Sequence, residues 1–199
     1  MPPTSNNLAA LLSSRICHDL VSPIGAIANG VELMQMAGGN GGPELDLISE
    51  SVENANARIR FFRIAFGVAA HDQRVPIKEI RDILADVTRG TRLQIDWQSD
   101  TDLLRSEVKL IFLLLLCFET AMPWGGKIVV TQPSTSWNVT GTSDRMKDLG
   151  PLWTILRDAT TEVDVNAAQV QFLLFPLLLQ ERMRSINLTV AADRVEAVF

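Results

Sequence analysis

The stretch Ser14–Met34, SRICHDLVSPIGAIANGVELM, decides the fold of the N-terminal part of the chain. Apolar residues recur in and around it at steps of three or four, which predicts one long amphipathic helix from about Asn7 to about Ala37. Its apolar positions are Leu8, Leu12, Ile16, Leu20, Ile24, Ile27, Val31 and Met34. At about 100° per residue, His18 projects from nearly the opposite face. The sequence therefore predicts an exposed histidine rather than one buried in a core.

Small or polar residues surround His18 on that face, namely Arg15, Ser22, Gly25 and Asn29. Neutral imidazole is a nucleophile near physiological pH, and an adjacent carboxylate such as that of Asp19 can orient the ring and accept a proton. Pro23 cannot donate an N–H to the carbonyl of Asp19, so a bend is expected directly after the histidine. This combination suits reversible phosphorylation on nitrogen. A solvated surface histidine is the alternative that so short a motif leaves open.

A second helix is predicted after the glycine-rich segment Gly38–Pro43, GGNGGP, which cannot stay helical. Its apolar residues follow the 3.5-residue spacing of a left-handed bundle: Leu45, Ile48, Val52, Ala55, Ile59, Phe62, Phe66 and Ala69. Two such helices form an antiparallel hairpin that cannot enclose its own apolar stripe, so we expect a homodimeric four-helix bundle. With the turn near Asn40, His18 would lie about level with Arg63, which is either a phosphoryl-binding cation or a solvated arginine.

The remainder of the chain mixes helical and strand patterns. A lesser stripe at the end of the second helix (Phe61, Ile64, Ala65 and Val68) is expected to dock a second domain, and the polar link His71–Pro76 divides the chain into domains 1–72 and 73–199. Helices are predicted near Ile77–Val87, Asp102–Met122, Leu149–Leu156 and Asn166–Arg184, and strands at Leu93–Trp97, Lys127–Thr131, Trp137–Thr140 and in a closing hairpin of Ile186–Val190 with Val195–Phe199. The expected fold class is α+β, with helices layered on one face of a mixed sheet.

Composition limits the possible partners and locations. The 199 residues are 47% apolar and carry a net charge of −5, which argues against nucleic acid or an anionic membrane as the main partner. Cys17 and Cys117 form no C-x-x-C motif, so we expect reduced thiols in the cytoplasm and no metal site or disulfide framework. The start, MPPTSNN, has no signal-peptide character, and the apolar runs at 110–118 and 172–179 are too short to span a bilayer.

The run CHDLVSPIGAIANG, Cys17–Gly30, resembles two related groups of proteins. It is similar to the phosphoacceptor helix of dimeric sensor histidine kinases, whose motif is His-Glu/Asp-Leu-x-x-Pro. The closer resemblance, near residue for residue over Ile16–Leu33, is to ChpT-type histidine phosphotransferases. This resemblance implies that His18 is the phosphoacceptor, that Asp19 is its acid neighbour, and that Ser22 influences phosphatase chemistry. It also implies a second domain resembling a kinase ATP-binding domain.

The second domain departs from the kinase pattern where nucleotide would bind. Glu119 and Thr120 stand where a metal-binding asparagine is expected. The helix predicted over Asp102–Met122 is followed by a Pro-Trp-Gly-Gly sequence. The glycines after that sequence are Gly141 and Gly150, and neither lies in an Asp-x-Gly-x-Gly run. Two isolated glycines cannot build two phosphate-cradling loops, so we expect no ATP binding and no cofactor. The phosphoryl group must then come from another protein.

These observations predict a cytoplasmic phosphorelay shuttle that moves a phosphoryl group between aspartates of receiver domains, those of a hybrid histidine kinase and of response regulators. Such receivers carry their own Mg²⁺. The expected receiver-binding residues are Arg15, Gly25, Ala26, Asn29 and Arg63. Three alternatives stay open: an ATP-dependent histidine kinase with divergent motifs, a non-enzymatic dimeric inhibitor of a two-component system, and an enzyme of unrelated chemistry that uses His18 with Asp19.

Overall fold

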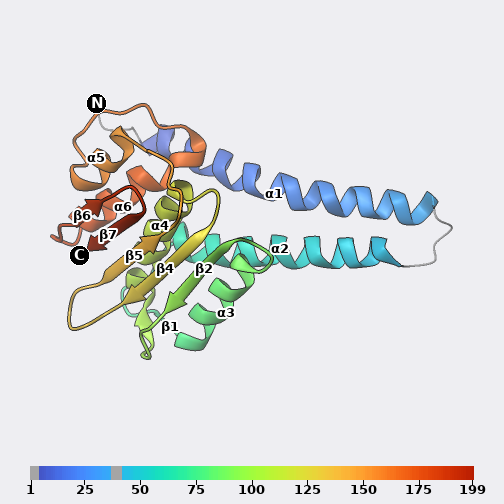
Figure 1. Cartoon of the computed structure of the whole chain (residues 1–199), viewed down its shortest axis with the longest axis horizontal. Coiled ribbons are helices and arrows are strands. Elements are labelled where there is room, and N and C mark those ends of the chain that lie inside the picture. The colour runs from blue at the N-terminus through green and yellow to red at the C-terminus, as the bar shows by residue number, and fades with distance from the viewer. Residues whose placement is uncertain (1–4, 37–41) are drawn as a thin grey trace.

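A long antiparallel helical hairpin leads into a domain built on one sheet (Figure 1). The computed structural model describes residues 5–36 and 42–199. The hairpin consists of α1 (Ser5–Met36) and α2 (Pro43–Ala65), and most of the glycine-rich turn predicted between them lies outside the described residues. Gly42 caps α2 and Pro43 begins it. Glu44 and Asp46 lie in its first turn, where their negative charge interacts favourably with the positive end of the helix dipole. α1 runs unbroken through Pro23.

The second helix ends at Ala65, earlier than the apolar repeat to Ala69 predicts. Cations from the next domain bond carbonyls at and just beyond its end. Arg105 donates to the carbonyl of Arg63 in the last turn, and Lys109 Nζ lies 2.9 Å from the carbonyl of Gly67, which follows the helix. Cationic side chains commonly satisfy the free carbonyls at a helix C-terminus. The helix therefore stops where the second domain takes over its hydrogen bonds.

Residues 74–198 form seven strands and the helices that cover them. In order they are β1 (Arg74–Val75), α3 (Ile77–Thr88), β2 (Leu93–Trp97), β3 (Leu103–Leu104), α4 (Arg105–Ala121), β4 (Gly126–Thr131), β5 (Asn138–Thr142), α5 (Pro151–Arg157), the 3₁₀ turn η1 (Ala167–Gln169), α6 (Gln171–Gln180), β6 (Asn187–Val190) and β7 (Arg194–Val198). The main sheet has the order β2-β4-β5-β7-β6, with β2 and β4 parallel and the other neighbours antiparallel. The predicted mixed sheet and closing hairpin are confirmed.

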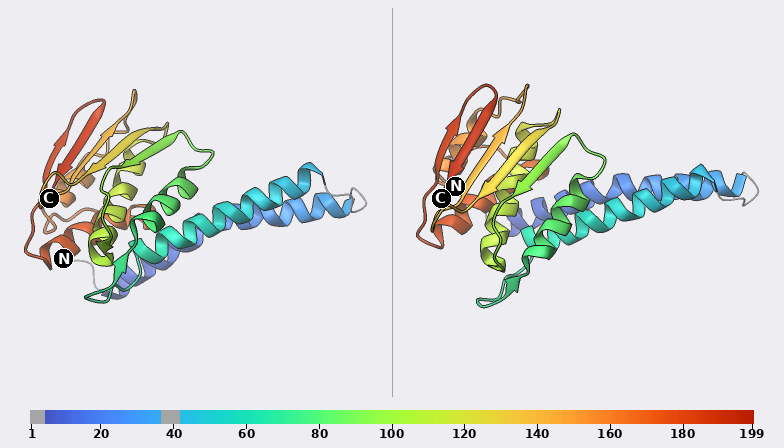
Figure 2. Two further views of the ribbon diagram at one scale, coloured as in Figure 1. Left: turned by 90° about the horizontal axis from the view of Figure 1, so that it is seen from below. Right: turned by 60° about the horizontal axis from the view of Figure 1, so that its bottom comes forward.

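The helices pack on one face of this sheet (Figure 2). Side chains of β4, β5 and β7 alternate between buried and partly exposed, as expected for a sheet with one covered face. α4 lies in the centre, so its run from Leu110 to Phe118 is buried on every side. Gly141 of β5 lets α4 approach the sheet, because a Cβ at this position would lie 3.0 Å from the Phe118 ring.

The predicted docking stripe on α2 is confirmed for three of its four residues. Phe61, Ile64 and Ala65 are buried, and the ring of Phe61 stacks on Phe112 of α4 with centroids 4.4 Å apart. Val68 is exposed, because it lies beyond the end of α2. The C-terminal half of α2 is thus part of the core of the second domain.

Two other local predictions differ from the structure. The single bent helix expected over Asn166–Arg184 is shorter: Asn166 and Gln169 form a capping box at η1, and α6 then runs from Gln171 to Gln180. The link after α2 is not merely a loop, since Arg74–Val75 pairs with Leu103–Leu104. No helix within the described residues is long and apolar enough to cross a membrane.

Candidate functional site

His18 projects into solvent from α1, as its place opposite the apolar stripe predicts. Its side chain is 79% exposed, and its Nδ1 lies 3.1 Å from Oδ1 of Asp19. Adjacent residues on a helix point about 100° apart. The Asp19 carboxylate nevertheless reaches the ring, in keeping with the expectation that it orients the imidazole. When Nδ1 carries the proton and donates it to Asp19, Nε2 keeps its lone pair.

Asp19 is itself held in place from the opposite side. Its carboxylate is only 13% exposed, and Oδ2 lies 2.9 Å from Nη2 of Arg15, one turn earlier in α1. Nη1 of Arg15 donates to the carbonyl of Ala168 in η1 at 2.6 Å. The second domain therefore fixes Arg15, Arg15 fixes Asp19, and Asp19 orients the imidazole of His18.

A pocket of about 460 Å³ lies between α1 and α2 beside His18. The α1 wall includes His18, Asp19, Ser22, Pro23 and Ala26. The α2 wall consists of Ser51, Asn54 and Arg58, none of which the sequence pattern had singled out. The pocket combines an imidazole, hydroxyl and amide groups, one carboxylate and two guanidinium groups, those of Arg15 and Arg58. It is thus suited to receive an anionic group.

Arg58, rather than Arg63, is the α2 cation on this pocket. Gly30 packs so closely on α2 that a Cβ there would lie 2.6 Å from Cγ1 of Ile48, which sets the register of the hairpin. This register places His18 about level with the C-terminal half of α2, and Arg58 is the arginine of that segment that lines the pocket with His18. Arg63 instead faces α3, where its guanidinium lies 3.9 Å from Glu79.

The remaining residues expected at a receiver interface are distributed along α1. Gly25 and Asn29 are exposed, and Ala26 is half-buried on the pocket wall. A Cβ on Gly25 would have no atom within 4 Å, so the helix surface is bare there. Arg15 differs from the expectation of an accessible contact residue, because its side chain is only 11% exposed and both its Nη atoms are already bonded.

The residues that stand where a kinase would bind metal and nucleotide have other partners. Glu119 accepts from Arg58, with Nη2–Oε1 at 2.9 Å, and Thr120 Oγ1 accepts from the buried Gln171 at 3.0 Å. Gly141 lies inside β5, and Gly150 precedes α5 with a φ of 47°. Among the described residues, no group of three His, Cys, Asp or Glu side chains could hold a metal ion.

Three similarities bear on the identity of the chain. A family model described as the histidine phosphotransferase C-terminal domain matches residues 77–194. The protein phosphotransferase ChpT of Brucella abortus (strain 2308) is 34% identical over 198 residues, which cover 95% of this chain and 93% of that protein. The 1.7 Å structure of a bacterial phosphotransferase has a TM-score of 0.79 at 30% identity and covers 100% of this chain and 99% of that one.

These similarities extend over the hairpin as well as the second domain, since the matches to whole proteins cover nearly the full chain. The resemblance read from Cys17–Gly30 is therefore confirmed by residues far outside that motif. The chain belongs to the ChpT-type histidine phosphotransferase family, which acts in phosphorelays of two-component signalling.

Proposed function

We propose that this chain carries a phosphoryl group between aspartates of two receiver domains and that His18 is its phosphoacceptor. The observation that carries the proposal is the geometry of the ring: Nδ1 faces a fixed carboxylate while the side chain is 79% exposed. Family membership supplies the reaction class. A solvated surface histidine would need no carboxylate held against its ring nitrogen.

In the proposed reaction the lone pair of His18 Nε2 attacks the phosphorus of an aspartyl phosphate on the incoming receiver. The N–P bond forms as the P–O bond breaks, and the aspartate leaves as a carboxylate with the bonding electron pair. The Nδ1 proton stays on the ring, where the charge of Asp19 stabilises the cationic imidazole. The reverse transfer then loads a second receiver.

The receiver side of the interface would supply the metal. Receiver domains bind Mg²⁺ in their own acidic pocket, where it neutralises the transferred oxygens, so the proposal assigns this chain no metal ligand. The exposed Gly25 and Asn29 and the half-buried Ala26 are proposed as part of the footprint on α1, and Ser22 as a residue that influences dephosphorylation.

The proposal places the phosphoryl donor on another protein rather than on ATP. Two arrangements support this. Glu119 and Thr120 are engaged by Arg58 and Gln171, and Gly141 and Gly150 serve strand packing and a helix start instead of a phosphate loop. The divergent kinase remains the alternative. The proposed cytoplasmic location is supported by the two free cysteines.

The proposal also includes a homodimer with a four-helix bundle. Part of each predicted apolar stripe is left exposed on a single chain. The exposed positions are Ile24 and Val31 of α1 and Leu45, Val52 and Ile59 of α2, with Ile24 57% exposed. They continue the helical spacing of the stripes, so a second copy of the same face would cover them.

A phosphorylated receiver domain and the full chain test this function. Transfer is expected to place acid-labile phosphate on the protein, and His18→Gln is expected to abolish it. Two results together would instead identify a non-enzymatic binding module. The wild-type protein would take up no phosphate, and His18→Gln would inhibit a kinase or receiver as strongly as the wild-type protein does.

A further inference from the structure

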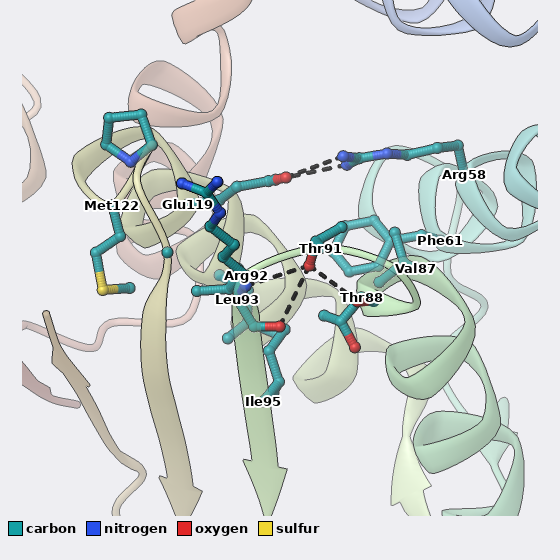
Figure 3. Close-up of a pocket in the computed structure, with 13 residues that line it drawn as sticks. Arg58, Phe61, Val87, Thr88, Thr91, Arg92, Leu93, Ile95, Glu119 and Met122 are labelled. Atoms are coloured by element: carbon teal, nitrogen blue, oxygen red, sulfur yellow. Dashed lines mark hydrogen bonds and ion pairs between the residues drawn. The ribbon is translucent and has the colours of Figure 1, made fainter.

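Arg58 lies on the wall of two adjoining cavities. One is the pocket beside His18, and the other is a cavity of about 320 Å³ between α2, α3, β2 and α4. Figure 3 shows the guanidinium reaching from α2 toward the carboxylate of Glu119 on α4. The contact is two-pronged, with Nη2–Oε1 at 2.9 Å and Nη1–Oε2 at 3.5 Å. It joins the hairpin to the second domain directly beside the reactive histidine.

The charge of Arg58 is balanced by carboxylates on both sides. Burial disfavours its charged form, but Glu119 and, more weakly, Asp19 outweigh burial and raise the pKa of Arg58 above its ordinary value. The influence of Asp19 indicates that the guanidinium lies within electrostatic reach of the group that orients His18. A phosphoryl group on His18 would add further negative charge to the same pocket, and guanidinium binds phosphate oxygens in the same two-pronged way as a carboxylate.

The two arginines of this pocket differ in how firmly they are held. Arg15 is bonded to Asp19 and to a backbone carbonyl of η1, which is a fixed part of the second domain. Arg58 is bonded to a single side chain, and both partners are partly exposed, at 27% for Arg58 and 36% for Glu119. Arg58 is therefore the arginine that can change partners without disturbing the backbone.

We infer that Arg58 is the cation that binds the phosphoryl group at His18 and that Glu119 holds its guanidinium until that group arrives. The inference rests on the proposed role of His18. Glu119 occupies the position where a kinase would carry a metal ligand. Here its carboxylate competes with the phosphoryl group for the guanidinium of Arg58. Phosphorylation of His18 thereby loosens a contact between the hairpin and the second domain.

A small phosphoryl donor tests this on the full chain without a receiver. Potassium phosphoramidate transfers its phosphoryl group to histidine nitrogen and releases ammonia, so initial rates of His18 phosphorylation against its concentration give KM and kcat. Arg58→Gln is expected to raise KM about tenfold or more, since a hydrogen-bonded charge pair is lost. Glu119→Gln is expected to lower KM severalfold, because Arg58 is released. Arg58→Lys should recover part of the loss.

The opposite signs of the two effects separate this role from a structural one. If the ion pair only held the domains together, Arg58→Gln and Glu119→Gln would change KM in the same direction, and that result would overturn the inference, as would an unchanged KM in Arg58→Gln. The double variant should match Arg58→Gln alone. If Arg58→Gln fails to fold, Glu119→Gln decides: a lowered KM supports the inference, and a raised or unchanged KM refutes it.

Arg60→Gln provides the matched control. Arg60 is on the same helix and pairs with Asp86 of α3 at 2.9 Å, away from the His18 pocket, so its removal should leave KM unchanged. A rise in KM for Arg60→Gln as large as that for Arg58→Gln would reveal a general charge effect and overturn the inference. Absence of labelling in the unmodified protein, or labelling that survives His18→Gln, would instead show that the proposed function itself is wrong.

Discussion

Nδ1 of His18 lies 3.1 Å from Oδ1 of Asp19, while the other oxygen of that carboxylate is held at 2.9 Å by Arg15. The second domain takes part in this arrangement, because Arg15 also donates to the carbonyl of Ala168. Orientation of the His18 ring therefore depends on residues from both parts of the chain.

Replacing Asp19 with asparagine should lower the rate of His18 phosphorylation by about tenfold or more, because the amide cannot stabilise the cationic ring and no longer pairs with Arg15. The rate with phosphoramidate measures the effect. Glu32→Gln, an exposed change on the same helix, is the control and should leave the rate unaltered. An Asp19→Asn protein as fast as the unmodified one would show that the carboxylate takes no part in the reaction.

Two glycines of α1 should respond in opposite ways to added side chains. Gly25 is bare, so Gly25→Ala should raise the free energy of unfolding by about 0.5–1 kcal/mol. Gly30→Ala should lower it by about 1–3 kcal/mol, because the new Cβ would lie 2.6 Å from Ile48. Urea denaturation measures both. Equal effects of the two substitutions would contradict the described packing of the hairpin.

Gly25 also tests the receiver footprint. Gly25→Gln should slow phosphotransfer from a receiver domain while leaving the rate with phosphoramidate unchanged, since the longer side chain blocks docking but does not touch His18. The comparison of the two donors in one variant is the measurement. Unimpaired transfer from the receiver would remove Gly25 from the proposed interface.

The proposed homodimer can be tested far from His18. Val31→Asp with Leu45→Asp should convert a particle of two chains into one of 21.9 kDa, as measured by light scattering after gel filtration. Leu47→Asp is the matched control, because Leu47 is also exposed but lies about 200° around α2 from Leu45. If the unmodified protein already has the mass of one chain, the bundle proposal is wrong.

The sequence was sufficient to predict the helix faces but not the register between them. Periodicity alone predicts that His18 is exposed and that Phe61 is buried, because the face on which a residue lies depends only on its own helix. Which residue of α2 lies beside His18 depends on where the turn is centred. The segment Gly38–Pro43 contains two glycine pairs, and either could form the turn. The structure answers this question: Arg58 lines the pocket beside His18, and Arg63 lies against Glu79 instead.

Contacts between distant segments were beyond prediction for the same physical reason. Arg58 and Glu119 are 61 residues apart, and Arg15 and Ala168 are 153 residues apart, so no local pattern connects them. Glu119 and Thr120 did stand out as departures from the kinase pattern. Their partners, Arg58 and Gln171, became visible only with the fold.

The buried Cys117 predicts a specific dependence of stability on pH. Burial raises the pKa of this thiol well above 9.0, against a smaller opposing effect of Arg15. Above that pH the unfolded chain loses the proton while the folded chain keeps it, so the free energy of unfolding should fall as pH rises, by at most about 1.4 kcal/mol per pH unit.

Cys117→Val should remove this slope, as measured by urea denaturation between about pH 8 and about pH 10.5, the range over which an ordinary thiol titrates. The chain has no tyrosine, so no phenol titrates in this pH range. Burial lowers the pKa of Lys109, and this shift makes the free energy of unfolding rise with pH. Both proteins contain Lys109, so its contribution cancels in the difference between their slopes. Identical slopes would contradict the burial of Cys117.

The source of the phosphoryl group is the most direct test of the central claim. The full chain is incubated with γ-labelled ATP alone, and in parallel with a phosphorylated receiver domain, and label on His18 is quantified as acid-labile phosphate. The account predicts label from the receiver and none from ATP. Label on His18 from ATP alone, with nothing taken up from the receiver, would contradict it.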